Sequence, residues 1–443
     1  MGPFGVIENQ VRIEMLEKVN EMRNEIIDLT SKLVKMHSVN PLYPGVETEK
    51  VLGGEKENNL VLKDVVESFG CKTSLVEKAK QRANLAAVMK GSGGGRSLIL
   101  NGHIDVVPYG DTKQWKWGDP VSGRVVDGRL YGRGSTDMKG GVSAMVKAVE
   151  AIVRAGYKLK GDVIIESVCG EESMSHELGT DAVTDAGYRA DAAIVTEPTA
   201  PPDRLAVVPV TPGAIWFRVH IDGKPVHTSV RDELFRAGGG GDAIGVNALE
   251  KGVKVIQALQ DLEQQWGISK KHPLFKPGHF VIHPGIMKAG PTGVLVPFII
   301  SDYCDIDYCI FYHPRQKYDS VRREVESHLK SACSRDTWLR GHPPKLEYLL
   351  HWPPAEISSR HPIVRTVADS HKQATGRTAK VNGFPAVCDA AFLDAKGIPA
   401  VVYGPGDLLV AHGFNEYVET SELIAATKTL ALSVLDWCGY TKA

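Results

Sequence analysis

The sequence predicts an α/β protein with a mostly parallel central sheet flanked by helices, into which a smaller α+β unit is inserted. Short apolar runs bounded by turn residues recur along the chain, and helical stretches such as residues 138–155 separate them. Such runs are typical of strands buried on both faces of a parallel sheet. The middle of the chain has a different pattern. We therefore predict a main domain formed by residues 1–210 and 353–443, interrupted by an inserted domain at residues 211–352.

Length and composition limit the class of protein. The 443 residues are enough for two or three separate cores, and 52 Lys and Arg residues nearly balance 53 Asp and Glu residues, giving a net charge of -1. This balance argues against nucleic-acid and membrane-surface partners. The seven cysteines are scattered and odd in number, with no CxxC pair. We expect a reducing, cytoplasmic setting rather than a disulfide framework or a zinc finger.

The elements of the main domain follow from hydrophobic periodicity. Residues 11–37 carry apolar side chains at helical spacing, which predicts one long amphipathic helix. Five short apolar runs predict strands, at residues 84–89, 97–100, 162–168, 191–195 and 398–403. Polar motifs follow several of these strands. Open α/β sheets bind ligands at the carboxyl ends of their strands.

The inserted domain shows an alternation of strand and helix patterns. The predicted order is β-α-β-β-α-β, with strands at residues 214–221, 278–287, 294–311 and 345–351 and helices at residues 242–264 and 320–334. This order fits a compact unit of two layers, one of helices and one of strands.

The stretch GHIDVVP follows the strand predicted at residues 97–100. His103 and Asp105 are two residues apart, so in an extended chain their side chains point to the same face. This is the geometry of a metal-binding histidine oriented by a neighbouring acid. A hydrogen-bonded His/Asp pair that closes the strand is the alternative interpretation, and these residues alone do not decide between the two.

Five further polar stretches carry candidate site residues: Asp137 in YGRGSTDMKGG, Glu171 and Glu172 in CGEES, Glu197 in TEPT, His412 in VAHGFNE and His227 in KPVHTS. Taken singly, each has an ordinary structural interpretation, such as a helix N-cap or a solvated edge. Taken together, strand ends of one sheet would bring two imidazoles and three carboxylates together. Mixed nitrogen and oxygen ligation suits zinc, cobalt or manganese, and a shared carboxylate allows two ions about 3.5 to 4 Å apart.

The combination GHIDVVP, GRGSTDMKGG, GEE, TEP and GPG with AHGFNE closely resembles the co-catalytic metallopeptidase and deacylase family of acetylornithine deacetylase, succinyl-diaminopimelate desuccinylase, aminoacylase-1 and glutamate carboxypeptidase. The resemblance runs from about Arg12 to the C-terminus. It implies two divalent ions, zinc or alternatively cobalt or manganese. The implied roles are one metal held by His103 and Glu197, the other by Glu172 and His412, Asp137 as the bridge, Glu171 as general base and Asp105 as the partner of His103.

The same resemblance implies a function. The protein would hydrolyse the amide bond of a small N-acyl amino acid or related N-acylated compound, with Glu171 moving a proton from water to the leaving amine. The inserted domain would act as a lid and would join two copies of the chain into a homodimer. Its GKPVH element would bring His227 into the neighbouring subunit's site to stabilise the oxyanion.

Departures from the family pattern concern the substrate. Relatives often carry an Arg that binds the substrate carboxylate on the strand at residues 305–312 and another just after Asp389, and this chain has neither. Val294 stands where relatives usually have Asn. We therefore expect a less charged or larger substrate. Its candidate contacts are Trp216, Tyr308 and Phe311.

Two rival functions remain open at this stage. One is a dipeptidase or carboxypeptidase on the same scaffold. The other is a non-catalytic binding protein on this fold, against which the complete apparent ligand set speaks.

Overall fold

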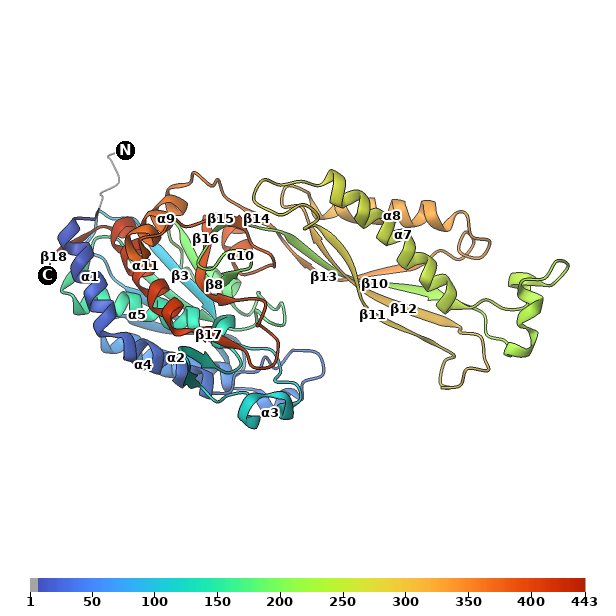
Figure 1. The fold of residues 1–443 in the computed structure, drawn as a ribbon, viewed down its shortest axis with the longest axis horizontal. Helices are drawn as coiled ribbons and strands as arrows, with labels where there is room; N and C mark the ends of the chain where they lie inside the picture. The colour runs from blue at the N-terminus through green and yellow to red at the C-terminus, as the bar shows by residue number, and fades with distance from the viewer. Residues whose placement is uncertain (1–6, 443) are drawn as a thin grey trace. The chain divides into compact units, whose positions relative to one another are not determined.

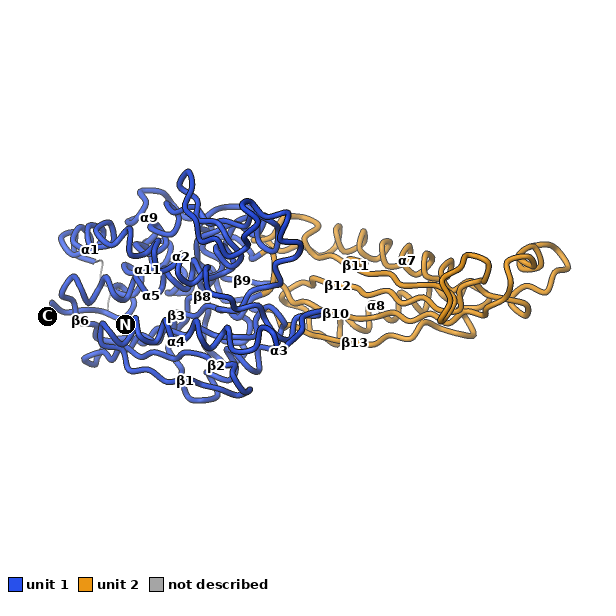
Figure 2. The backbone as a smooth tube through the Cα atoms, turned by 90° about the horizontal axis from the view of Figure 1, so that it is seen from below, with its two compact units in different colours: residues 1–211, 355–384, 388–443 blue, residues 212–354, 385–387 orange. Residues whose placement is uncertain are grey.

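The structure, a computed structural model, describes residues 7–442. The chain forms two compact units, which Figure 2 colours separately. Unit 1 consists of residues 1–211, 355–384 and 388–443, and unit 2 consists of residues 212–354 and 385–387. Within residues 7–442, none of the helices combines the length and apolar character needed to cross a membrane.

Unit 1 is built on a nine-stranded sheet with the order β1-β2-β7-β3-β8-β16-β9-β14, in which β15 also pairs with β9. The strands are β1 Lys72–Ala79, β2 Arg82–Met89, β3 Leu98–His103, β7 Val163–Val168, β8 Ala193–Ala200, β9 Val207–Thr211, β14 Ala355–Glu356, β15 Val381–Gly383 and β16 Ala400–Asp407. The central strands β7, β3, β8 and β16 are parallel, whereas β1, β2, β9 and β14 add antiparallel pairings. The predicted fold class is confirmed.

Helices cover both faces of this sheet (Figure 1). One face carries α1 Asn9–Glu21, α2 Arg23–Lys35, α4 Gly54–Ser68, α5 Gly140–Arg154, α9 Pro362–Thr375 and α11 Thr420–Cys438. The other carries α6 Thr180–Asp185 and α10 Ala390–Ala395. Alternation along β2 shows the two sides, because Leu85 and Ala87 join the large core whereas Ala86 packs with Val183 of α6. Burial on both faces explains the continuous apolar runs in the sequence.

The predicted single helix at residues 11–37 is wrong, because the structure has two helices there. α1 ends at Glu21 and α2 begins at Arg23, with Met22 between them at φ -83° and ψ 6°. Both helices pack on α5 and α11, and α2 packs in addition on the segment that precedes α5. The buried Met22 continues the helical spacing of apolar residues, so periodicity alone did not show the break.

Smaller elements complete unit 1. A three-stranded sheet joins β4 Arg124–Val126, β5 Arg129–Tyr131 and β17 Tyr417–Glu419 in the order β17-β5-β4. β6 Tyr157–Leu159 pairs with β18 Tyr440–Lys442, and α3 Thr48–Val51 is a single turn. The pairing of β5 with β17 brings the segment before α5 next to the segment before α11.

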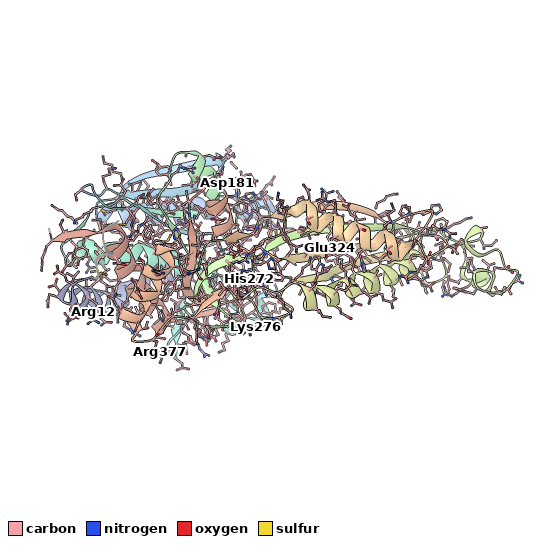
Figure 3. The ribbon with its side chains drawn as sticks, turned by 90° about the horizontal axis from the view of Figure 1, so that it is seen from above. Arg12, Asp181, His272, Lys276, Glu324 and Arg377 are labelled. Carbon is pink, nitrogen blue, oxygen red and sulfur yellow. The ribbon has the colours of Figure 1, made fainter. Side chains whose placement is uncertain are left out.

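Unit 2 has the predicted order of elements. Its antiparallel sheet has the order β11-β12-β10-β13, formed by β10 Gly213–Asp222, β11 Val281–Gly290, β12 Tyr303–Tyr312 and β13 Lys345–Trp352, with helices α7 Ala248–Ser269 and α8 Tyr318–Cys333. Phe217 and Val219 of β10 are buried against the helices. Between the two helices, Glu324 of α8 (Figure 3) accepts hydrogen bonds from Trp266 and Lys270.

The first helix of unit 2 begins later than predicted. α7 starts at Ala248, where the side chain of Asn247 accepts a hydrogen bond from the backbone N–H of Leu249. Asparagine is a favoured N-cap, and it ends the irregular segment before it. Residues 241–243 form only a short 3-10 turn.

Candidate metal centre and active site

Four neighbouring parallel strands deliver most of the candidate residues to one edge of the unit 1 sheet. β3 ends at His103, and Glu197 lies in the second half of β8. Glu171 and Glu172 follow β7 after a turn at Gly170, whose φ of 90° favours glycine. His412 follows β16. Because carboxyl ends of parallel strands meet at the same edge, residues far apart in sequence converge there.

Asp137 reaches the same edge from the segment between β5 and α5. It lies in a short irregular helical turn, residues Ser135–Lys139, directly before α5. The start of α5 approaches β8 very closely, since a Cβ atom on Gly141 would lie 2.0 Å from the Thr196 carbonyl oxygen. Only glycine allows this close approach. The approach places Asp137 next to the carboxyl ends of the strands.

The two oxygens of Asp137 face two different histidines. Oδ1 lies 3.1 Å from His103 Nε2, and Oδ2 lies 3.2 Å from His412 Nε2. A second carboxylate accompanies each histidine: Glu197 Oε1 lies 3.6 Å from His103 Nε2, and Glu172 Oε2 lies 3.1 Å from His412 Nε2. The structure thus brings together the two His/Glu pairs on either side of Asp137.

The fourth carboxylate of the cluster lies beside the first pair. Glu171 Oε2 is 3.9 Å from His103 Nε2, and its side chain is 12% exposed. It follows Gly170 and directly precedes Glu172, so the same turn that positions a candidate ligand also holds Glu171 next to it.

The cluster concentrates negative charge away from water. Burial raises the pKa of Glu171 and of Glu197 well above the usual range, and repulsion from neighbouring carboxylates adds to the rise. His412 is the exposed member of the cluster, with a side chain that is 52% exposed. Its partial burial opposes the charged form, yet hydrogen bonds to Asp137 and Glu172 raise its pKa to about 12. Each ionised carboxylate here favours a nearby positive charge.

The donor set fits divalent cations. One potential ligand atom from each of His103, Asp137 and Glu172 lies within 4.8 Å of the others. Glu172 Oε1 is buried without a hydrogen-bond partner in the described structure. Four carboxyl groups with two imidazoles suit metals that accept mixed nitrogen and oxygen ligands.

Asp105 is placed differently from the simplest reading of the His-x-Asp spacing. His103 Nδ1 lies 2.9 Å from the backbone carbonyl oxygen of Asp105, whereas the carboxylate oxygen Oδ1 is 3.8 Å away. The other oxygen, Oδ2, accepts hydrogen bonds from Asn40 Nδ2 at 2.7 Å and from the backbone N–H of Glu172 at 3.0 Å. An Nδ1–H that donates to a carbonyl leaves the Nε2 lone pair facing the cluster.

The remaining predicted site residue, His227, lies in unit 2. It is exposed, and its Nδ1 is 2.8 Å from Ser229 Oγ and accepts a hydrogen bond from the backbone N–H of Ser229. Its role at a neighbouring subunit's site stays a prediction.

One expected substrate contact is wrong. Tyr308 is 1% exposed and stacks on Phe217 in the core of unit 2, because alternate residues of β12 point toward the helices. Trp216 and Phe311 are partly exposed.

Three buried residues that contact the site were not predicted from the sequence. Arg133 and Glu416 form an ion pair, and Asn40 binds Asp105. Arg133 and Glu416 stand inside the GRG and HGFNE motifs, so charged residues within glycine-rich motifs were the signal that could have found them. Asn40, in SVNP, gave no comparable signal.

A cluster of carboxylates and histidines at the carboxyl edge of a mostly parallel sheet defines the class: a metal-dependent hydrolase. Residues 99–436 match the model of Peptidase family M20/M25/M40, and the chain belongs to this family. The predicted family and the hydrolysis of amide bonds are both confirmed.

Two curated relatives show the range within the family. The chain is 34% identical to N-formyl-4-amino-5-aminomethyl-2-methylpyrimidine deformylase of Halalkalibacterium halodurans, over 97% of this chain and 98% of that protein. It is 28% identical to acetylornithine deacetylase of Myxococcus xanthus, over 81% of this chain and 85% of that protein.

Solved structures share the fold. Human carnosine dipeptidase 1 superposes with a TM-score of 0.71 at 17% identity, covering 97% of this chain and 99% of that chain. The YXEP protein of Bacillus subtilis, described as a dinuclear metal-binding peptidase of the M20 family, gives a TM-score of 0.62 at 14% identity, covering 94% of this chain and 99% of that chain.

Proposed function

We propose that this protein is a dinuclear amidohydrolase that removes a formyl or similarly small acyl group from an amine lacking a neighbouring carboxylate, such as an aminomethyl group on a heteroaromatic ring. The H. halodurans relative is named as the deformylase of an amide of this kind, N-formyl-4-amino-5-aminomethyl-2-methylpyrimidine. The main support for this substrate class is the ion pair that engages Arg218, the arginine found on the strands of unit 2.

Family resemblance places an arginine that binds the substrate carboxylate on the strand corresponding to β12, which has none. Arg218 of β10 is the arginine of the four unit 2 strands, all of which lie within the described residues. Its Nε and Nη2 donate to the two carboxylate oxygens of Asp307 at 2.6 and 2.9 Å. A guanidinium already engaged through a two-pronged carboxylate pair offers poor binding to a second carboxylate.

In the proposed centre, His103 and Glu197 would hold one ion, Glu172 and His412 would hold the other, and Asp137 would be the ligand that they share. The pairing of each histidine with its own glutamate and one oxygen of Asp137 supports this assignment. The donor set suits zinc, with cobalt and manganese as alternatives. When bound, such ions supply Lewis acidity that activates water and polarises an amide carbonyl.

Glu171 performs the proton transfers. Its carboxylate takes a proton from water as the water oxygen bonds to the carbonyl carbon, and it returns that proton to the amine nitrogen as the C–N bond breaks. The products are a carboxylic acid, which is formic acid for a formyl substrate, and the free amine. The backbone carbonyl of Asp105 keeps the proton of His103 on Nδ1.

The proposal includes a homodimer formed through unit 2, with His227 of one subunit stabilising the oxyanion in the other. β11 is an edge strand, and its Ile286 and Met287 are 49% and 40% exposed. An unpaired strand edge with exposed apolar side chains is a template for pairing with a second copy. A cytoplasmic setting, which the scattered cysteines favour, belongs to the same proposal.

Mixing two inactive variants tests the role of His227. If His227 acts across the dimer, hybrids of Glu171→Gln with His227→Ala contain one site with both native residues and recover activity. Recovery fails if His227 acts within its own subunit. Light scattering of the wild type measures the dimer itself.

A substrate panel tests the proposed substrate class. The zinc-loaded enzyme would be assayed for acid release from N-formyl-4-amino-5-aminomethyl-2-methylpyrimidine, N-formylbenzylamine, N-acetylornithine, N-succinyl-diaminopimelate and free dipeptides. We expect kcat/KM for the formylated pyrimidine to exceed that for N-acetylornithine by at least about 100-fold, because the lost two-pronged contact is costly. A preference for N-acetylornithine or for dipeptides would overturn the proposed substrate.

A further inference from the structure

Arg133 and Glu416 form an ion pair behind the proposed metal centre. Arg133 Nη1 lies 2.6 Å from Glu416 Oε2, and the two side chains are 3% and 0% exposed. Arg133 follows β5 by two residues, and Glu416 directly precedes β17. The pair therefore continues the β5–β17 ladder inward, toward the carboxyl edge of the main sheet.

The second oxygen of Glu416 binds the backbone at Asp137. Glu416 Oε1 accepts hydrogen bonds from the backbone N–H groups of Thr136 at 3.0 Å and Asp137 at 3.2 Å. A charged acceptor makes stronger hydrogen bonds than a neutral one, especially where water is excluded. Glu416 thus fixes the backbone from which the carboxylate facing both histidines projects.

The other end of the pair binds the backbone at His412. Arg133 Nη2 donates to the carbonyl oxygen of His412 at 3.1 Å and to that of Pro108 at 3.4 Å. His412 has a φ of 60°, in the left-handed region that residues other than glycine rarely adopt. Its carbonyl is held by a buried cation in this unusual conformation. Pro108 belongs to the segment that follows His103 and Asp105.

We infer that Arg133 and Glu416 are positioning residues that lock the three ligand-bearing segments, residues 103–108, 133–137 and 412–416, into the spacing that two ions require. Neither side chain is a proposed ligand. This inference rests on the proposed metal centre. It predicts that the pair sets metal affinity, which a purely structural ion pair elsewhere on the same ladder does not.

The same ladder provides a matched control. Arg129 Nε lies 2.8 Å from Glu419 Oε1, and these residues face each other across β5 and β17. Their side chains are 43% and 24% exposed, and they bind no backbone group of the ligand segments among the described contacts. Identical substitutions can therefore be made at the buried pair and at the exposed pair.

The test compares Glu416→Gln with Glu419→Gln. Each metal-free protein is first checked for cooperative unfolding, and zinc affinity is then measured by competition with a chromophoric chelator, with metal content determined after gel filtration. We expect Glu416→Gln to weaken binding of at least one ion by about 10- to 100-fold, the usual effect of losing a partner behind a ligand. Glu419→Gln should bind like the wild type. The visible spectrum of the cobalt-loaded protein should change only for Glu416→Gln.

A double variant covers the case in which Glu416→Gln alone does not fold. Arg133→Met with Glu416→Gln removes both charges together and leaves no buried charge unpaired, and Arg129→Met with Glu419→Gln is its control. A folded buried-pair variant that binds both ions within twofold of the wild type overturns the inference while leaving the metal centre intact. A wild type that binds no ions overturns the centre itself.

Discussion

His103 in unit 1 and His220 in unit 2 both lie among carboxylates but differ in burial. His220 lies between two carboxylates, with Nδ1 2.6 Å from Asp305 and Nε2 3.1 Å from Asp222. It is 34% exposed, whereas His103 is 1% exposed. In unit 2, Lys345 lies 2.8 Å from Asp222 and Arg218 pairs with Asp307.

The difference shows what separates the candidate metal site from a surface network. The two carboxylates beside His220 are partly exposed, and Asp222 also pairs with Lys345. The carboxylates around His103 are largely buried, and two imidazoles lie among them. Negative charge that is buried and in excess creates a strong demand for bound cations. The spacing of histidines and acids along the chain does not reveal this excess of negative charge, because the excess depends on which side chains the fold buries.

Replacing His103 and His220 in turn has the largest expected effect. We expect His103→Ala to lose one ion and to lower kcat by more than the roughly 100-fold that loss of an outer partner costs. His220→Ala should keep both ions and normal turnover. Metal analysis and steady-state kinetics measure both. Equal losses in the two variants would contradict the distinction.

Glu171→Gln separates charge used for chemistry from charge used for binding. We expect kcat to fall by about 10²- to 10⁴-fold, as loss of a general base predicts. Metal content should not fall, since Glu171 is not a proposed ligand. Parallel kinetics and metal analysis check this, with Glu172→Gln as the matched ligand variant that loses metal. Normal turnover by Glu171→Gln would remove it from the mechanism.

Asn40→Ala tests the hydrogen bond that the Asn40 side chain donates to Asp105 beside the candidate site. Its hydrogen bond to the buried Asp105 is charge-assisted, and its loss should lower unfolding free energy by about 1.5–3 kcal/mol. We expect at most about a 10-fold loss of metal affinity, because Asn40 acts through Asp105. Chemical denaturation and chelator competition give the two numbers. Unchanged stability would show that water replaces the amide.

The pH dependence at His220 is the smallest expected effect. Burial opposes its charged form, but Asp305 and Asp222 outweigh burial and raise its pKa above 6.5. Its stabilising contribution is therefore present below pH 6.5 and is lost as pH rises through the raised pKa. His220→Gln should cost more stability at pH 5.5 than at pH 8.5, by less than about 1 kcal/mol because the pair is partly exposed. A larger cost at pH 8.5 would reverse the sign.

Much of the fold was predictable from the sequence, since buried strands and amphipathic helices carry strong periodic signals. The order of elements in unit 2 follows directly from such signals. The break at Met22 does not, because its apolar side chain fits the helical spacing on both sides. Nor does the start of α7, which depends on the side chain of Asn247 binding the backbone.

Sequence motifs predicted the side chains of the candidate site. They did not predict the hydrogen bonds that these side chains make to backbone groups. The spacing of His103 and Asp105 suggested contact between their side chains, yet the hydrogen bond runs to the backbone carbonyl. Backbone partners leave no residue type to read in the sequence. The links made by Arg133 and Glu416 were missed for the same reason, because most of them end on N–H and C=O groups.

The connection between the two units has a topological consequence. Thr211 and Ala355, at the ends of the segment that leaves and re-enters unit 1, are directly paired in the antiparallel β9–β14 ladder. Residues 212–354 are thus, in topological terms, the loop of a β-hairpin, and a turn of a few residues would close the same ladder. The insertion does not change the strand order of the sheet, and it adds no crossover connection. A module of any size whose ends lie close together could occupy the same position in the chain.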